Sequence, residues 1–291
     1  MPYAILPEDT SVEAAVRRIA REEAEGALKA VRGPGDLAPR VHEMRKTVKK
    51  LRGLLRLVRP VFPDAKAENE VLRDAGRGLS DLRDAAVQLA TIQRLSEDMP
   101  EDRRARLLAP FEAAAGHQDQ EAAPRLLPAF AASMAGLRDR SQDWTRDAEG
   151  WDALEPGLEA TWAGARKGLR AARKSPSEDD LHEWRKRVKD HWYQARLLRP
   201  IWPAMMDPHV AAADTLGEVL GQVNDLAVLC DRLEAAPLEE ALRSEARDLA
   251  DLRHGALMAQ AIPLGRRLLA GPPEALADRW RVWWKLRREN A

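Results

Sequence analysis

The chain has 291 residues, of which 45% are apolar and 32% are charged. This length suits one large domain or two ordinary ones, and the apolar share allows a sizeable core. Lysine and arginine together number 47, as do aspartate and glutamate, so the formal net charge is zero. A neutral chain is not typical of a nucleic-acid-binding or membrane-surface protein, although the sum hides how the charges are distributed.

Long amphipathic segments predict an all-α fold, because no stretch alternates apolar and polar residues as a strand would. The single cysteine, Cys230, has no partner for an internal disulfide, and we expect it to be a small buried apolar residue in a reducing environment. The chain shows no recognisable signal peptide and no long apolar run. A soluble, cytoplasmic protein that does not contact membranes is therefore expected.

Proline and glycine residues divide the chain into predicted helices. In the first half these span 11–32, 39–59, 64–97, 101–115 and 125–148, with stops at Gly33-Pro34-Gly35, at Pro60 and Pro63, and at Pro124 and Pro128. In the second half they span 152–174, 178–199, 204–234 and 238–260, followed by a basic-aromatic helix at 273–289.

The order of motifs in the first half returns in the second. Residues 42–49 (HEMRKTVK) match residues 182–189 (HEWRKRVK) at an offset of 140, and an Arg-Pro-x-aromatic-Pro stop follows each copy, at 59–63 and 199–203. Residues 79–84 then align with 220–225 at an offset of 141. Such a duplication predicts two similar helical halves, 1–148 and 149–291, related by a pseudo-twofold axis within one domain that shares a core.

The first copy of the motif has one apolar and one basic helix face. At about 100° per residue, the apolar side chains of Met44, Val48, Leu51, Leu54, Leu55 and Val58 fall together. Opposite them, Gly53 is expected to let another molecule approach the backbone closely. The basic face around Gly53 contains His42, Arg45, Lys46, Lys49 and Arg56.

The second copy repeats this pattern, with Tyr193 in the place of Gly53. Like charges at these helical spacings repel one another, and we expect Glu43 and Glu183 to point away from the basic faces. We therefore interpret the two faces as anion-binding surfaces instead of charged surfaces that are only hydrated. A bound phosphate would also raise the pKa of each motif histidine. We assign no role to the histidines at 117, 191, 209 and 254. The second basic face contains His182, Arg185, Lys186, Lys189 and Arg196.

Other cations near these faces are weaker candidates. We expect the tryptophans of the terminal helix, Trp280, Trp283 and Trp284, to be buried where that helix docks. The weaker candidates are Arg17 and Arg21, Arg166 and Arg170 with Lys174 following, and Lys50.

The doubled His-x-x-Arg-Lys-x-x-Lys helix, with its Arg-Pro-x-aromatic-Pro stops, resembles the CHAD family of histidine-bearing α-helical domains. The resemblance extends over essentially the whole chain. It implies a single domain, 1–291, of two four-helix bundles with a basic channel or groove between them. It also implies binding of inorganic polyphosphate and association with polyphosphate granules. The motif residues of both copies would contact phosphates, extended by Arg52, Arg56 and Arg196.

The same resemblance assigns supporting roles and exposes departures. Asp84 and Asp225 are expected to orient cations or cap helices. Asp190 stands where a basic residue is expected opposite Lys50, and Ala86 stands where a second acid is common, so the second site should be less cationic. The Glu-x-Glu-x-Lys element of the triphosphate-tunnel domains often fused to this family is not found in the sequence.

We therefore expect non-enzymatic binding of a long polyanion that weakens steeply with salt, with no catalytic residue, metal or cofactor. Two alternatives remain open. One is an enzyme that processes polyphosphate or phosphate esters, with a motif histidine as phospho-acceptor. The other is a nucleic-acid binder, which would need aromatic platforms on the basic faces, or a scaffold for an acidic protein. The sequence makes nucleic acid the less favoured ligand.

Overall fold

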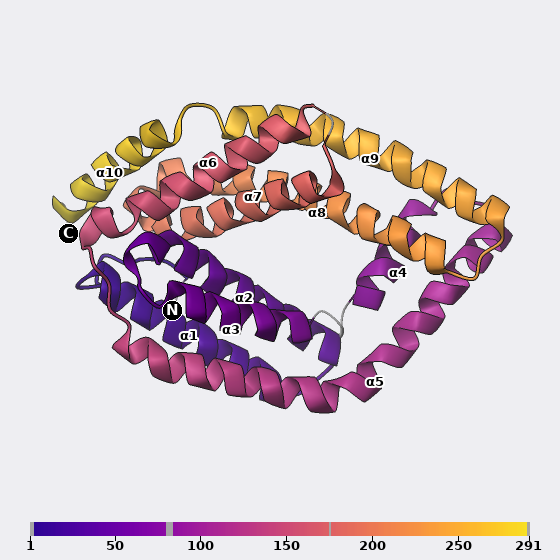
Figure 1. Cartoon of the computed structure of the whole chain (residues 1–291), viewed down its shortest axis with the longest axis horizontal. Coiled ribbons are helices and arrows are strands. Elements are labelled where there is room, and N and C mark those ends of the chain that lie inside the picture. Colours follow the sequence, from indigo (N-terminus) through magenta and orange to yellow (C-terminus); the bar gives the residue numbers. More distant parts are fainter. Residues whose placement is uncertain (1–2, 80–83, 175, 290–291) are drawn as a thin grey trace.

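The computed structural model describes residues 3–79, 84–174 and 176–289, with side chains described except at 116–122 and 288–289. Within these ranges the chain forms α-helices joined by short turns and 3-10 helices, and no strand is present (Figure 1). The all-α prediction is confirmed.

The helices of the first half depart from the sequence prediction at three places: one predicted helix is divided, two predicted helices are merged, and the merged helix ends at Arg140 instead of at residue 148. The predicted helix at 64–97 is wrong as a single element, because α3 ends at Gly78 and α4 begins at Asp84. Residues 80–83, which belong to the segment 79–84 that aligns with 220–225, lie outside the described residues. The predicted break near Pro124 and Pro128 is also wrong. Both prolines lie inside the continuous helix α5, which packs along its length against other helices that outweigh the lost backbone hydrogen bonds. The bounds are α1 Val12–Arg32, α2 Leu37–Val58, α3 Ala65–Gly78, α4 Asp84–Leu95 and α5 Glu101–Arg140.

The helices of the second half follow the prediction closely. One differs in length, since α9 continues through Pro263 beyond its predicted end near residue 260. At the start of α7, the Ser177 hydroxyl accepts from the backbone N–H of Asp180, whose carboxylate accepts from the backbone N–H of Ser177. This capping box fixes where the second basic helix begins. The bounds are α6 Glu155–Ala172, α7 Glu178–Leu198, α8 Pro203–Ala235, α9 Glu240–Leu268 and α10 Pro273–Glu289.

The helices form two groups that share one core. In the first group α1, α2, α3 and the C-terminal part of α5 pack together, and in the second α6, α7, α8 and α9 do so, with α10 lying on α6 (Figure 1). Helix α4 and the N-terminal part of α5 leave the first group and pack against α8 and α9, where Arg106 pairs with Glu239 at 3.0 Å. The twofold relation between the halves and a channel between them stay predictions.

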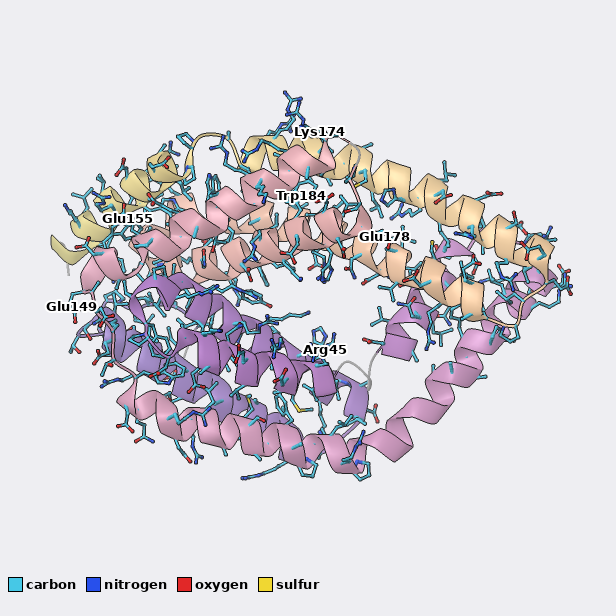
Figure 2. All side chains as sticks on the ribbon, viewed as in Figure 1. Arg45, Glu149, Glu155, Lys174, Glu178 and Trp184 are labelled. Atoms are coloured by element: carbon cyan, nitrogen blue, oxygen red, sulfur yellow. The ribbon has the colours of Figure 1, made fainter. Side chains whose placement is uncertain are left out.

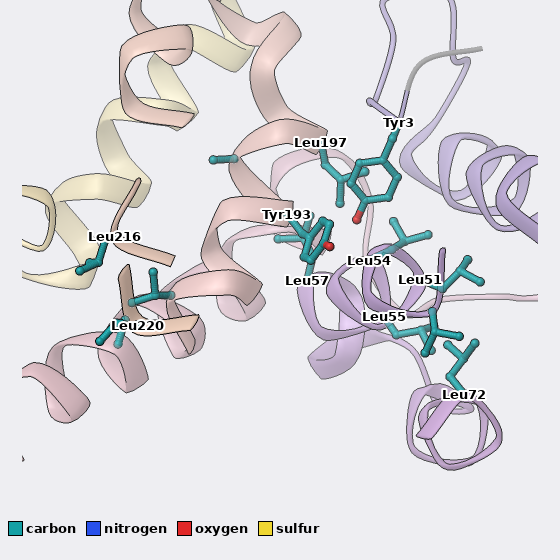
Figure 3. Packing of buried hydrophobic residues seen from close by; sticks show 14 of the residues in the cluster. Tyr3, Leu51, Leu54, Leu55, Leu57, Leu72, Tyr193, Leu197, Leu216 and Leu220 are labelled. Atoms are coloured by element: carbon teal, nitrogen blue, oxygen red, sulfur yellow. The ribbon is translucent and has the colours of Figure 1, made fainter. Parts of the chain in front are cut away.

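The two groups meet where α2 packs against α7 and α6. Gly53 is buried, and a Cβ placed on it would lie 2.7 Å from the Cβ of Tyr193. The prediction that Gly53 opens the backbone to a ligand is therefore wrong, because Tyr193 of the other repeat fills that space (Figure 3). At the α2–α6 contact, Gly157 touches the backbone of Leu57 so closely that its missing side chain is required.

The apolar face predicted for α2 is buried, as is the corresponding face of α7. The expected burial of Trp280 and Trp284 is confirmed, whereas Trp283 is only partly buried. Cys230 is partly buried at the edge of the core instead of fully enclosed, and burial raises the pKa of its thiol. Among the described residues no helix has the length and apolar character needed to cross a bilayer.

A histidine pair lies inside the second group. The Nε2 atoms of His191 and His209 are 2.7 Å apart, so one ring donates to the other. Trp162 stacks on His209, and Trp280 stacks on His191. Burial lowers the pKa of His191 well below its ordinary value and that of His209 to about 4, so both rings are neutral at pH 7.

Candidate functional site

The basic side chains of the first repeat lie along the solvent side of α2, opposite its buried apolar face. His42 and Lys49 are exposed, and Arg45 and Lys46 are half-buried. In Figure 2, Arg45 lies within the outline of the molecule, between the helices of the two groups, and Lys174 lies at its outer edge. The arrangement keeps the charged heads of α2 hydrated while their helix contributes to the core.

Acidic side chains reach several of these cations, which corrects the prediction that they avoid the basic faces. The Lys46 ammonium lies 3.4 Å from Glu43, and the equivalent Lys186 ammonium lies 2.5 Å from Glu183. Both pairs are spaced i, i+3, a distance that long flexible side chains span easily. Glu43 and Glu183 therefore neutralise part of each basic face.

Contacts from α8 hold the second repeat's basic residues more firmly. Asn224 Oδ1 lies 2.6 Å from Nδ1 of His182. The Lys189 ammonium lies 2.6 Å from Glu218 and 3.3 Å from Asp214. Asn224, one residue before the expected Asp225, thus orients the motif histidine.

Gly217 of α8 makes room for the stem of Lys189 on α7. A Cβ on Gly217 would lie 2.6 Å from Cδ of Lys189, whereas a Cβ on Gly221 would be in ordinary contact with Nε of Arg185 at 3.8 Å. The Lys189 ammonium also lies 4.3 Å from the centre of the Trp192 ring. Sequence reasoning missed the contact of Gly217 with Lys189, because the two residues lie on different helices.

Charges of both repeats influence the pKa of the Glu218 carboxylate. The hydrogen bond from Lys189, together with the charges of Lys189, Arg185 and Lys49, holds the pKa of Glu218 below its ordinary value. Lys49 belongs to α2 and the other two cations to α7. The two predicted basic helices therefore act electrostatically on one point.

A second group of charges lies between α2 and α7 around Asp190. Arg56 donates to this carboxylate, and Arg187 lies 3.5 Å from it. Burial raises the pKa of Asp190, against the opposing effect of Arg56 and Arg187. Arg52, whose pKa is lowered by burial and by Arg56, donates to Asn69 at 3.1 Å. Arg56 is thus an inter-repeat contact as well as a member of the predicted site.

Two other predicted site residues, Lys50 and Arg196, lie near the ring of Tyr3. The Lys50 ammonium lies 5.4 Å from the centre of the Tyr3 ring and the Arg196 guanidinium 5.7 Å from it. Lys50 also binds Glu23 at 2.7 Å, and the Tyr3 hydroxyl donates to the carbonyl of Lys50. Tyr3 of the N-terminal segment therefore contacts both Lys50 and Arg196.

The weaker candidates divide between two places. On α1, Arg17 pairs with Glu13 at 2.9 Å and donates to the Trp144 carbonyl at 2.8 Å, whereas Arg21 is exposed. On α6, Arg166 is half-buried and Arg170 is exposed. Asp84 opens α4 in its first turn, and Asp225 lines a recess between α4, α8 and α9. Within the described ranges, no three His, Cys, Asp or Glu side chains gather as ligands for a metal ion.

Comparison with known proteins agrees with this architecture. The family model described as CHAD domain matches residues 11–234. The chain belongs to the CHAD family. The crystal structure of the CHAD domain from the plant Ricinus communis is similar, with a TM-score of 0.58 and 21% identity over 91% of this chain and 92% of that one. At this identity the likeness shows the fold. No curated protein matches the chain in sequence.

Proposed function

We propose that this CHAD protein binds inorganic polyphosphate without chemical turnover, through the cations of α2 and α7. One observation carries the proposal: α2 and α7, which bear the two sets of basic side chains, pack against each other, and Lys189 of α7 already binds a carboxylate, that of Glu218, at 2.6 Å. A surface that gathers cations from two helices suits a ligand with many closely spaced charges. In a cell, such binding would bring the protein to polyphosphate granules in the cytoplasm.

The physics of binding is that of a polyelectrolyte. Polyphosphate carries about one negative charge per repeating unit, and each contacting cation releases a condensed counterion, so affinity falls as salt rises. Arginine presents a fork of donors that fixes phosphate oxygens in place, whereas lysine acts as a point charge. Longer chains reach more cations at once and bind more tightly through multivalency.

The test is titration of the protein with polyphosphate of graded length at several salt concentrations. The variant Arg45→Ala/Lys46→Ala/Arg185→Ala/Lys186→Ala removes two cations from each repeat and is expected to weaken binding about 100-fold or more and to flatten the salt dependence. A matched control removes four arginines that lie on helices other than α2 and α7, Arg106, Arg125, Arg138 and Arg247, and should leave affinity within about threefold.

Three results would contradict the proposal. Equal losses in the quadruple variant and its control would mean that net charge alone governs binding. RNA or DNA that competes equally at matched phosphate concentration would favour a nucleic-acid ligand. Release of phosphate from labelled polyphosphate with divalent metal and nucleotide present would show an enzyme.

A further inference from the structure

Helix α8 places a carboxylate on the predicted phosphate-binding cations of the second repeat. The Lys189 ammonium lies 2.6 Å from Oε1 of Glu218 and 3.3 Å from Oδ1 of Asp214. The Lys189 side chain is 18% exposed, whereas that of Glu218 is 69% exposed. The carboxylate can therefore turn into solvent without uncovering the core, while the stem of Lys189 stays fixed over Gly217 and Trp192.

The first repeat has no acidic residue at the positions that correspond to Asp214 and Glu218. At the offset of 141 that aligns Gly76 with Gly217, the positions of Asp214 and Glu218 correspond to Arg73 and Arg77. Both arginines are exposed on α3. The same two helix positions thus carry positive charge in the first repeat and negative charge in the second, so the two repeats offer a polyanion unequal surfaces.

We infer that Glu218, aided by Asp214, is a built-in competitor that occupies the phosphate position at Lys189 until polyphosphate displaces it. This rests on the proposed function. Polyphosphate then binds first along the more cationic face of the first repeat and reaches the second repeat by exchanging a phosphate for the Glu218 carboxylate. The exchange makes engagement of the second repeat dependent on chain length, because only a chain already held on α2 has the local concentration to compete.

The variant Glu218→Gln removes the competing charge and keeps the size of the side chain. Polyphosphate should bind it about threefold to tenfold more tightly at about 50 mM salt, and the gain should shrink at higher salt. For chains too short to displace Glu218 from the unaltered protein, the plot of log affinity against log salt should also steepen by roughly 0.7–0.9, because Lys189 then makes one additional phosphate contact. Long chains should gain more than short ones, because only a chain that reaches the second repeat bears the cost of displacing Glu218 from the unaltered protein.

Glu234→Gln is the matched control, because it makes the same charge change on the same helix, at a residue that pairs with Arg247. It should bind polyphosphate as the unaltered protein does, within about twofold. The inference is overturned if Glu218→Gln binds no more tightly than the unaltered protein, or if Glu234→Gln gains equally. Failure of the proposed function looks different, since the unaltered protein would then not bind polyphosphate at all. Circular dichroism of both variants should retain full helicity, because both glutamates are exposed.

Discussion

The contact between α6 and α2 makes a sharp prediction for Gly157→Ala. Gly157 is the third residue of α6, and a Cβ placed on it would lie 1.9 Å from the carbonyl oxygen of Leu57 and 2.8 Å from that of Arg56. These are backbone atoms of α2 and cannot rotate out of the way. Helix α6 would have to move about 1.5 Å to restore ordinary contact, and α2 and α7 would lose their present fit.

The size of the effect follows from two opposing terms. Alanine is favoured over glycine inside a helix by about 0.8–1.0 kcal/mol, and by less in a first turn. Overpacking against rigid atoms costs about 1–3 kcal/mol, and a backbone clash falls at the upper end. We expect the free energy of unfolding to fall by about 2–3 kcal/mol and the midpoint of thermal unfolding by roughly 5–10 °C.

The assay is urea unfolding followed by circular dichroism, with Gly26→Ala as the control. Gly26 is an exposed glycine within α1, and a Cβ there would meet nothing within 4 Å. That variant should therefore be more stable than the unaltered protein by up to about 1 kcal/mol. If Gly157→Ala is as stable as Gly26→Ala, the close backbone contact between α6 and α2 is refuted.

Two further predictions concern the second helix group. Burial holds the folded-state pKa values of His191 and His209 below those of the unfolded chain, so the unfolded state binds more protons and stability is lost as pH falls below about 6.5. For His209 the pKa is about 4, so its contribution is lost between about pH 6.5 and about pH 4. For His209 alone the loss reaches about 3 kcal/mol, and His209→Gln should make urea unfolding less pH-dependent in that window; an unchanged slope would contradict this account. Ser177→Ala removes the N-cap of α7 and should lower the free energy of unfolding by about 1 kcal/mol, whereas Ser177→Thr should preserve most of it.

Helical periodicity was enough to predict which face of α2 is buried. Met44, Leu51 and Leu54 recur at the spacing of one helix face, and all three are buried. The repeat also indicated that two basic helices belong to one domain, and they do contact each other. Both predictions depend only on the spacing of residues along the chain, which can be read directly from the sequence.

The partners of the basic side chains were harder to predict because most come from other helices. Nothing local links Lys189 to Glu218, which lies on the next helix, or Arg56 to Asp190, which lies in the other repeat. The pairing of Glu43 with Lys46 was within reach, since its i, i+3 spacing is visible in the sequence. The unbroken course of α5 past Pro124 was not, because tertiary packing decides it.

The reach of α4 and the N-terminal part of α5 across to α8 and α9 has a consequence for synthesis. As the chain leaves the ribosome, residues 84–110 emerge long before residues 240–268, against which they finally pack. Until then the apolar side chains that finally face α8 and α9 lack those partners, and the structure of the first half stays incomplete until the whole chain has been synthesised. We therefore expect chaperones to bind the incompletely folded first half late in translation, when this half has already left the exit tunnel of the ribosome.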